Sequence, residues 1–137
     1  MAFPINVLPD AELAVIQYLR SRSEVTTLVP SERITTTRPA SPEYPLVMVQ
    51  RIGGLADAWQ QIDEPALQVD VVGGSRYQCQ ELARTIRACL LAIRNDTVTE
   101  ATLVSGAEEV SIQWLPDQVV VPPLARYVAR YRVLIHK

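Results

Sequence analysis

The sequence predicts an α+β fold, a two-layer sandwich in which two helices cover one face of a mainly antiparallel sheet of four to five strands. Two long segments, near residues 11–22 and 76–94, repeat apolar residues at helical spacing. Shorter segments alternate apolar and polar residues or are rich in β-branched residues, and Gly or Pro separates them. The predicted order of elements is αβββαββ.

The composition is that of one folded domain, which we expect to span residues 1–137. Hydrophobic residues make up 48% of the chain and charged residues 20%, an ordinary balance for a globular protein. The net charge of −2 argues against general nucleic-acid binding. No segment has the pattern of a signal peptide or a membrane span, so we expect folding in a cytosol, with Cys79 and Cys89 reduced.

The first helix is expected to begin after Asp10, which suits an N-cap, and to end near Arg22 or Ser23. Its apolar arc comprises Leu13, Val15, Ile16 and Leu19. The second helix begins at Ser75, which forms a capping-box pattern with Gln78. It is expected to run to about Arg94, and its buried stripe comprises Cys79, Leu82, Ala83, Ile86, Leu90 and Ile93.

Three strands are predicted between these helices, at residues 33–38, 46–52 and 67–71. Pro39 stops the first strand, and Gly53-Gly54 ends the second. A loop then runs to about Pro65, and it holds Asp57, Trp59, Asp63 and Glu64.

After the second helix we expect a loop at 95–106 with a short strand at 102–105, a strand at 109–115, and a long last strand at 125–136. A Pro-rich loop at 116–123 holds Val120. Alternation in the last strand directs one set of residues to the core: Tyr127, Ala129, Tyr131, Val133 and Ile135. Arg126, Arg130 and Arg132 then lie on the other sheet face, which is expected to be polar and available to partners.

No residue pattern predicts catalysis, a cofactor site or a metal site. His136, the only histidine, has no placed nucleophile or acid beside it, and the two cysteines match no zinc or redox spacing. The turn Gly73-Gly74-Ser75 before the second helix resembles an anion site in outline. It lacks the glycine or lysine spacing of a phosphate loop, so a tight turn with an N-cap is the favoured interpretation.

Asp70 falls on the sheet face opposite the core, where Arg51 and Arg132 are possible partners across strands. Two interpretations remain open, a cross-strand pair within the chain and a contact between subunits.

Three stretches resemble one known family. They are Arg33-Ile34 to Arg38-Pro39, Tyr44-Pro45-Leu46-Val47 to Gly53-Gly54, and Asp63-Glu64-Pro65 to Asp70 continuing into Ser75-Arg76. Over residues 25–95 this order of blocks resembles the tail terminator proteins of siphophages, also described as tail completion or head-to-tail joining proteins. The resemblance implies an α+β domain that forms a hexameric ring on the end of the tail tube.

The same resemblance implies that the ring ends tube polymerisation and docks on the head–tail connector or stopper. It also implies that phage DNA passes through the lumen without sequence-specific binding. It implies a place in the virion at the tail–neck junction after synthesis in the bacterial cytoplasm, no cofactor and no membrane. Head-to-tail contact between an acidic stretch at 57–70 and the basic strand at 126–137 would close such a ring.

The subunit-interface candidates are Arg51, Asp70, Arg126, Arg130 and Arg132, and the docking-loop candidates are Asp57, Trp59, Asp63, Glu64 and Val120. The nearest alternative is another neck component, such as a head-completion or stopper protein, or a tail-tube subunit. A small ligand-binding or enzymatic domain that uses the Gly73 turn, and a non-viral assembly adaptor, are the alternatives from other classes.

Overall fold

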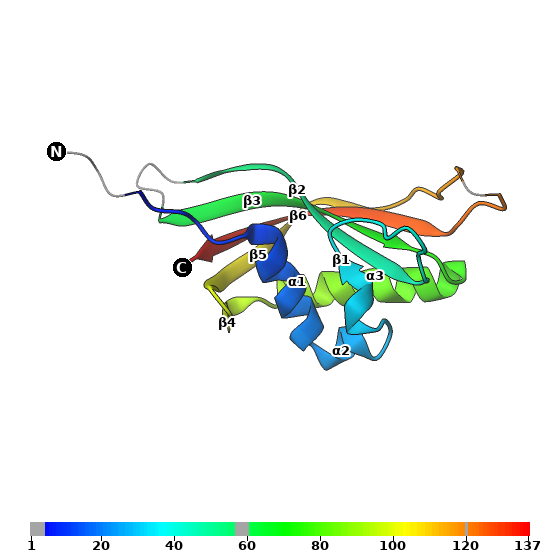
Figure 1. Ribbon diagram of the computed structural model, residues 1–137, viewed down its shortest axis with the longest axis horizontal. Coiled ribbons are helices and arrows are strands. Elements are labelled where there is room, and N and C mark those ends of the chain that lie inside the picture. The colour runs from blue at the N-terminus through cyan, green and yellow to red at the C-terminus, as the bar shows by residue number, and fades with distance from the viewer. Residues whose placement is uncertain (1–4, 57–60, 120) are drawn as a thin grey trace.

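The computed structural model describes residues 5–56, 61–119 and 121–137, with the backbone alone described at 108–111. Helices α1 (Ala11–Ser21), α2 (Ser23–Thr26) and α3 (Arg76–Leu91) lie on one face of a single sheet (Figure 1). The sheet order is β1-β2-β3-β6-β5-β4. Its strands are β1 (Ile34–Thr35), β2 (Leu46–Ala56), β3 (Ile62–Val72), β4 (Arg94–Val98), β5 (Ala101–Trp114) and β6 (Arg126–His136). A short 3-10 turn, η1 (Ser31–Arg33), precedes β1.

Both predicted long helices are confirmed, with the caps expected from the sequence. The Asp10 carboxylate accepts the Leu13 N–H at 3.0 Å, and the Ser75 hydroxyl accepts the Gln78 N–H at 3.1 Å. The Gln78 side chain returns to the Ser75 N–H at 3.0 Å and completes the capping box. Helix α3 ends at Leu91, earlier than expected, because the chain enters β4 at Arg94.

The prediction of a loop from Gly53 to Pro65 is wrong, because most of this segment belongs to the two strands of a β-hairpin, at the end near its turn. Strand β2 continues to Ala56, and β3 begins at Ile62. A register shift between Arg51 and Gly53 marks a bulge, and Gly54 has φ +102°. A Cβ on Gly54 would lie 2.2 Å from the Glu64 carbonyl oxygen. These glycines therefore serve a bulge and a close strand approach, not a strand end.

Over the described residues the sheet has six strands, where four to five were expected. The first strand, predicted at 33–38, is shorter in the structure: only β1 (Ile34–Thr35) is formed, and it pairs parallel with β2 at Val47 and Met48. The segment expected as a loop at 95–106 forms β4 and the start of β5. The other adjacent strand pairs are antiparallel, as predicted.

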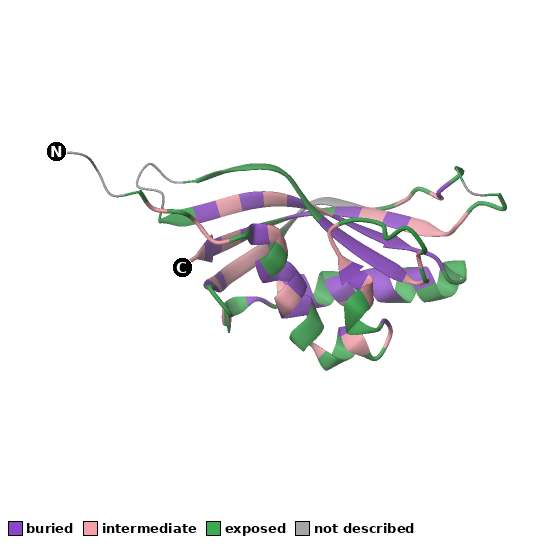
Figure 2. Cartoon of the chain, viewed as in Figure 1, coloured by how far each residue is buried: buried purple, intermediate pink, exposed green. Residues whose placement is uncertain are grey.

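The main core fills the space between the helices and the sheet, and the residues of β6 predicted to face it are buried there (Figure 2). The expectation that the helix-free face is polar throughout is wrong. A second apolar cluster of Leu46, Met48 and Val72 lies on that face, and Tyr44 and Leu124 pack against it. Because the segments containing Tyr44 and Leu124 supply this cover, one end of the helix-free face is closed to solvent.

Candidate functional site

Exposed apolar side chains lie at two opposite ends of the domain, where the β2–β3 hairpin and the segment between β5 and β6 extend past the helices (Figure 1). One end is the hairpin tip, residues 52–56 and 62, where Ile52, Leu55 and Ile62 are exposed. The other end is the arm, residues 115–119 and 121–124 between β5 and β6, where Val119 is 91% exposed and Val121 is 89% exposed. Exposed apolar groups of this kind often mark contact sites for other proteins.

The base of the arm is held by hydrogen bonds. Asp117 and Leu124 exchange backbone hydrogen bonds of 2.9 and 3.0 Å. Asp117 is 5% exposed, and its carboxylate accepts from Arg38 at 2.8 Å and from the Val119 N–H at 3.1 Å. The hydrogen bond from Arg38 lowers the pKa of Asp117, with a further contribution from the Val119 N–H. The arm therefore presents its valines from a fixed base.

The sequence did not predict that Arg38 and Asp117 form a pair, because they are 79 residues apart. The local signal was the Pro116-Asp117 pair in a Pro-rich loop, which predicts a turn but names no distant partner.

The base of the hairpin tip is also held by hydrogen bonds. Asp63, predicted as a docking residue, is instead 2% exposed. Arg51 donates to its two carboxylate oxygens at 2.5 and 2.9 Å, and the Arg51 backbone N–H donates to the Glu12 carboxylate at 2.8 Å. These contacts connect β2, β3 and α1 at the point where the hairpin leaves the body of the domain.

Asp70 lies on the helix-free face as predicted, at 9% exposed. Its partner is Gln68, which donates at 3.0 Å, whereas Arg51 pairs with Asp63 and Arg132 pairs with Glu64 at 3.4 Å. Burial raises the pKa of Asp70, and the Gln68 hydrogen bond opposes this shift. The proposed contacts of Asp70 with Arg51 and Arg132 are therefore not formed within the chain.

Strands β3 and β6 are neighbours in one sheet, so the acidic and basic stretches of the sequence lie side by side in one chain. Arg126 donates to the Leu115 carbonyl at 2.7 Å and helps to hold the arm. Arg130 and Arg132 are exposed on the helix-free face. Three predicted docking residues, Asp57, Trp59 and Val120, lie outside the described residues.

The Gly73-Gly74-Ser75 turn is occupied by the protein's own groups. The Gly73 N–H donates to the Ala125 carbonyl at 2.8 Å, and a Cβ on Gly73 would lie 2.4 Å from the Tyr44 Cβ. The Ser75 N–H already bonds Gln78. A tight turn with an N-cap accounts for these contacts, in agreement with the favoured interpretation of the sequence.

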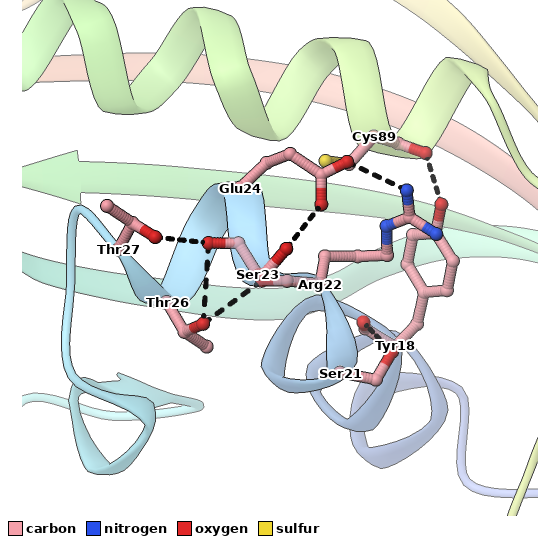
Figure 3. Close-up of polar contacts among 8 residues, drawn as sticks. All are labelled: Tyr18, Ser21, Arg22, Ser23, Glu24, Thr26, Thr27 and Cys89. Atoms are coloured by element: carbon pink, nitrogen blue, oxygen red, sulfur yellow. Dashed lines mark hydrogen bonds and ion pairs between the residues drawn. The ribbon is translucent and has the colours of Figure 1, made fainter.

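A groove of about 480 Å³ is lined by Arg22, Glu24 and residues of α3. Figure 3 shows the polar contacts of Arg22, Glu24 and Cys89, together with the Tyr18 contact that joins α1 to α3. The Tyr18 hydroxyl donates to the Cys89 carbonyl at 2.6 Å, and Arg22 donates to Glu24 at 2.8 Å. Burial raises the pKa of the Cys89 thiol, and burial also raises the pKa of the Cys79 thiol, to about 11. Both thiols are therefore protonated at neutral pH, which is the state of core cysteines and not of nucleophiles.

Within residues 5–56, 61–119 and 121–137, no three His, Cys, Asp or Glu residues come together as a metal site. No helix in these ranges combines the length and apolar character needed to cross a membrane.

A family model of phage tail termination proteins matches residues 7–131. The chain belongs to this family. The structure is also similar to a chain from the virion of a native gene transfer agent particle, with a TM-score of 0.67 and 14% identity, covering 93% of this chain and 95% of that chain. A search of curated proteins finds no similar sequence.

As a member of the phage tail termination family, the chain is a structural protein of the virion tail. This membership confirms the family resemblance of the sequence and extends it beyond residues 25–95 to nearly the whole chain. It also explains why the exposed features are apolar tips and charged faces that suit contact with other proteins.

Proposed function

We propose that this protein forms a ring, a hexamer, that caps the tail tube, ends tube polymerisation and joins the tail to the head connector or stopper. The observation that carries this proposal is the family match across residues 7–131. The ring's partners are further copies of the chain, the tail-tube protein and the connector, and phage DNA passes through its lumen without sequence-specific contacts.

The two apolar ends of the sheet support a joining role, because a joint must offer separate surfaces to two neighbours. We assign the hairpin tip and the arm to these two contacts. Leu55 is 81% exposed at one end, and Val119 and Val121 project at the other. The fixed bases of both elements reduce the ordering cost of docking.

Of the five subunit-interface candidates, Arg130 and Arg132 are exposed to another molecule or DNA, although Arg132 also contacts Glu64 at 3.4 Å. Arg51, Asp70 and Arg126 are engaged within the chain. We therefore assign these three residues to the positioning of the hairpin, the sheet face and the arm.

Electron microscopy of the purified protein tests the ring directly. Rings of one size, with no growth into long tubes, are the expected result. Long tubes would indicate a tail-tube subunit, and monomers at all concentrations would refute the proposal.

Addition of the protein to the polymerising tail-tube protein of the same phage tests termination. Tubes should shorten as the ring concentration rises. Leu55→Asp and the double change Val119→Asp with Val121→Asp should each abolish one of the two docking contacts, since a charge replaces an apolar contact. Tyr77→Asp is the matched control, because Tyr77 is 74% exposed but lies on α3. Equal loss in the control would contradict the assignment.

A further inference from the structure

The outer face of helix α3 carries a stripe with the spacing of a coiled-coil seam. This α3 stripe comprises Tyr77, Glu81, Arg84 and Ala88, which follow one another at intervals of four, three and four residues. Positions with this spacing face a partner helix when two helices pack side by side. All four residues are exposed, whereas the buried side of α3 packs against the main core. The α3 stripe is therefore a second seam, on the side of the helix that points away from the sheet.

The two charges at the centre of the stripe are not engaged within the described chain. Among residues 5–56, 61–119 and 121–137, neither the Glu81 carboxylate nor the Arg84 guanidinium takes part in an ion pair or a side-chain hydrogen bond. The Thr85 hydroxyl donates to the Glu81 backbone carbonyl at 2.9 Å and leaves the carboxylate unused. Both charges are therefore available to another molecule.

The stripe forms one wall of the groove of about 480 Å³. At one end of the groove the wall consists of the small residues Ala88 and Ala92, and Arg22 and Glu24 line the groove opposite them; Figure 3 shows Arg22 and Glu24 beside α3. Tyr77 lies in the same wall and is 74% exposed. It is 11 residues before Ala88, which is about 17 Å along the helix. The groove thus has an open end at Ala88 and a bulky, exposed side chain at the other end.

A second, antiparallel copy of α3 matches this pattern. If Glu81 lies level with Arg84 of the second copy, then Tyr77, four residues earlier, lies level with Ala88, four residues later. The two-fold axis repeats both matches, so that two layers join opposite charges and two layers join a large side chain with a small one. Charged layers in the middle of such a pair favour this register over its neighbours, because a shifted helix leaves them unpaired.

The residues beside the stripe are compatible with the same register. They are Gln78 and Thr85 on one side and Gln80 and Arg87 on the other, so like charges do not face each other across the pair. Helix α2 also leaves room, because it lies beside the half of α3 near Cys89 (Figure 3). The two-fold axis then places α2 of the second copy beside the opposite half of the pair.

We propose that the α3 stripe is a pairing surface for a second copy of this chain, in which Tyr77 of each copy occupies the Ala88 end of the other copy's groove. The contact is isologous, because both copies use the same surface. It is separate from the proposed ring, since the residues assigned above to the ring and to the two docking contacts lie outside α3. Four layers of one helix pair make a small interface, so the Kd is on the order of 0.1 mM. Such a pair holds free subunits together at high concentration and releases them readily.

Sedimentation velocity of charge variants tests the pairing. Glu81→Arg and Arg84→Glu should each weaken association about tenfold or more, because each variant creates two layers of like charge. An equimolar mixture of the two variants should pair as well as the native chain, because every central layer then joins opposite charges. Glu32→Arg is the matched control, since Glu32 is exposed and lies outside α3, and it should pair like the native chain.

Disulfide formation tests the direction and register of the helices. Chains with Tyr77→Cys and chains with Ala88→Cys should link to each other when mixed, and neither should link to itself. In a pair of identical variants the two thiols lie about 17 Å apart along the helices, whereas a disulfide requires Cα atoms within about 7 Å. The native Cys79 and Cys89 are buried and should not interfere. Linkage of Ala88→Cys to itself would indicate parallel helices and overturn the inference.

The remaining outcomes separate this contact from the ring. All of these variants should still form rings on grids. A native chain without a two-subunit species up to about 1 mM, or single charge variants that pair like the native chain, would overturn the inference and leave the proposed function intact. Loss of rings together with loss of pairing in Glu81→Arg would place α3 in the ring contact and also overturn it. Pairing without any ring from the native chain would support the inference and refute the proposed function.

Discussion

Replacement of Asp117 should loosen the arm by a predictable amount. Asp117→Ala removes the charge-assisted bond from Arg38 and the acceptor of the Val119 N–H. Hydrogen bonds to charged groups contribute about 1.5–3 kcal/mol each when buried. The Arg38 side chain is 34% exposed, so water replaces part of this loss, and we expect about 2 kcal/mol for the whole change. The melting temperature should fall by about 8 °C.

Asp117→Asn is the matched variant, because its amide oxygen still accepts the Val119 N–H while the ion pair is lost. Asp117→Asn should lower the free energy of unfolding by about 1 kcal/mol and the melting temperature by about 4 °C. The pKa of Asp117 is lowered in the folded state, so its stabilisation is present above the unfolded pKa and is lost as pH falls through the folded one. The difference between the native protein and Asp117→Asn in urea denaturation should therefore begin to shrink as pH falls below about 4, the unfolded pKa, and should disappear only below the lowered folded pKa. A difference that persisted in acid, or equal losses in the two variants at neutral pH, would refute this account.

Three further predictions concern packing, charge and pH. Gly106→Ala should destabilise the fold by about 2–3 kcal/mol in urea denaturation, because its Cβ would lie 2.2 Å from the Leu90 carbonyl oxygen; an unchanged midpoint would show that α3 yields freely. Asp70→Asn should stabilise the protein at pH 7 and lose this advantage in acid, since burial raises the Asp70 pKa and the native protein is favoured as that carboxyl protonates. Charge reversal at Arg130 and Arg132 should cost under about 1 kcal/mol of stability and keep rings on grids while weakening salt-dependent DNA retention; loss of rings from a folded subunit would place both residues at the subunit interface.

The helices were predictable because their signals are local. The caps at Asp10 and Ser75 and the apolar stripes lie within a few residues of one another, and the structure confirms them. The hairpin was not predictable from local signals, because glycine pairs and proline are common in loops. Gly53, Gly54 and Pro65 are strand residues here only because β2 pairs with β3. Gly54 pairs with Pro65 itself, and that register is set by long-range contacts that no local pattern displays.

The charged residues show the same limit. Alternation correctly placed Asp70 and Arg132 on the face opposite the main core, but it does not specify which residues lie level across strands. The observed register brings Arg132 near Glu64 and leaves Asp70 beside Gln68. The expectation of a polar face failed for a related reason, since the cover of Met48 comes from a segment far along the chain, at Leu124.

The two ends of the sheet share one construction that connects stability with the proposed joining role. Each end carries a segment that extends past the helices, the hairpin at one end and the arm at the other. Each segment has a nearly buried carboxylate bound by an arginine at its base, Asp63 with Arg51 and Asp117 with Arg38. Buried ion pairs add little net stability, because desolvation offsets their attraction, but removal of one partner is costly. Such pairs therefore select one geometry more than they strengthen the fold. A protruding tip with one geometry loses less conformational entropy on docking, which is what a subunit between two preformed assemblies requires.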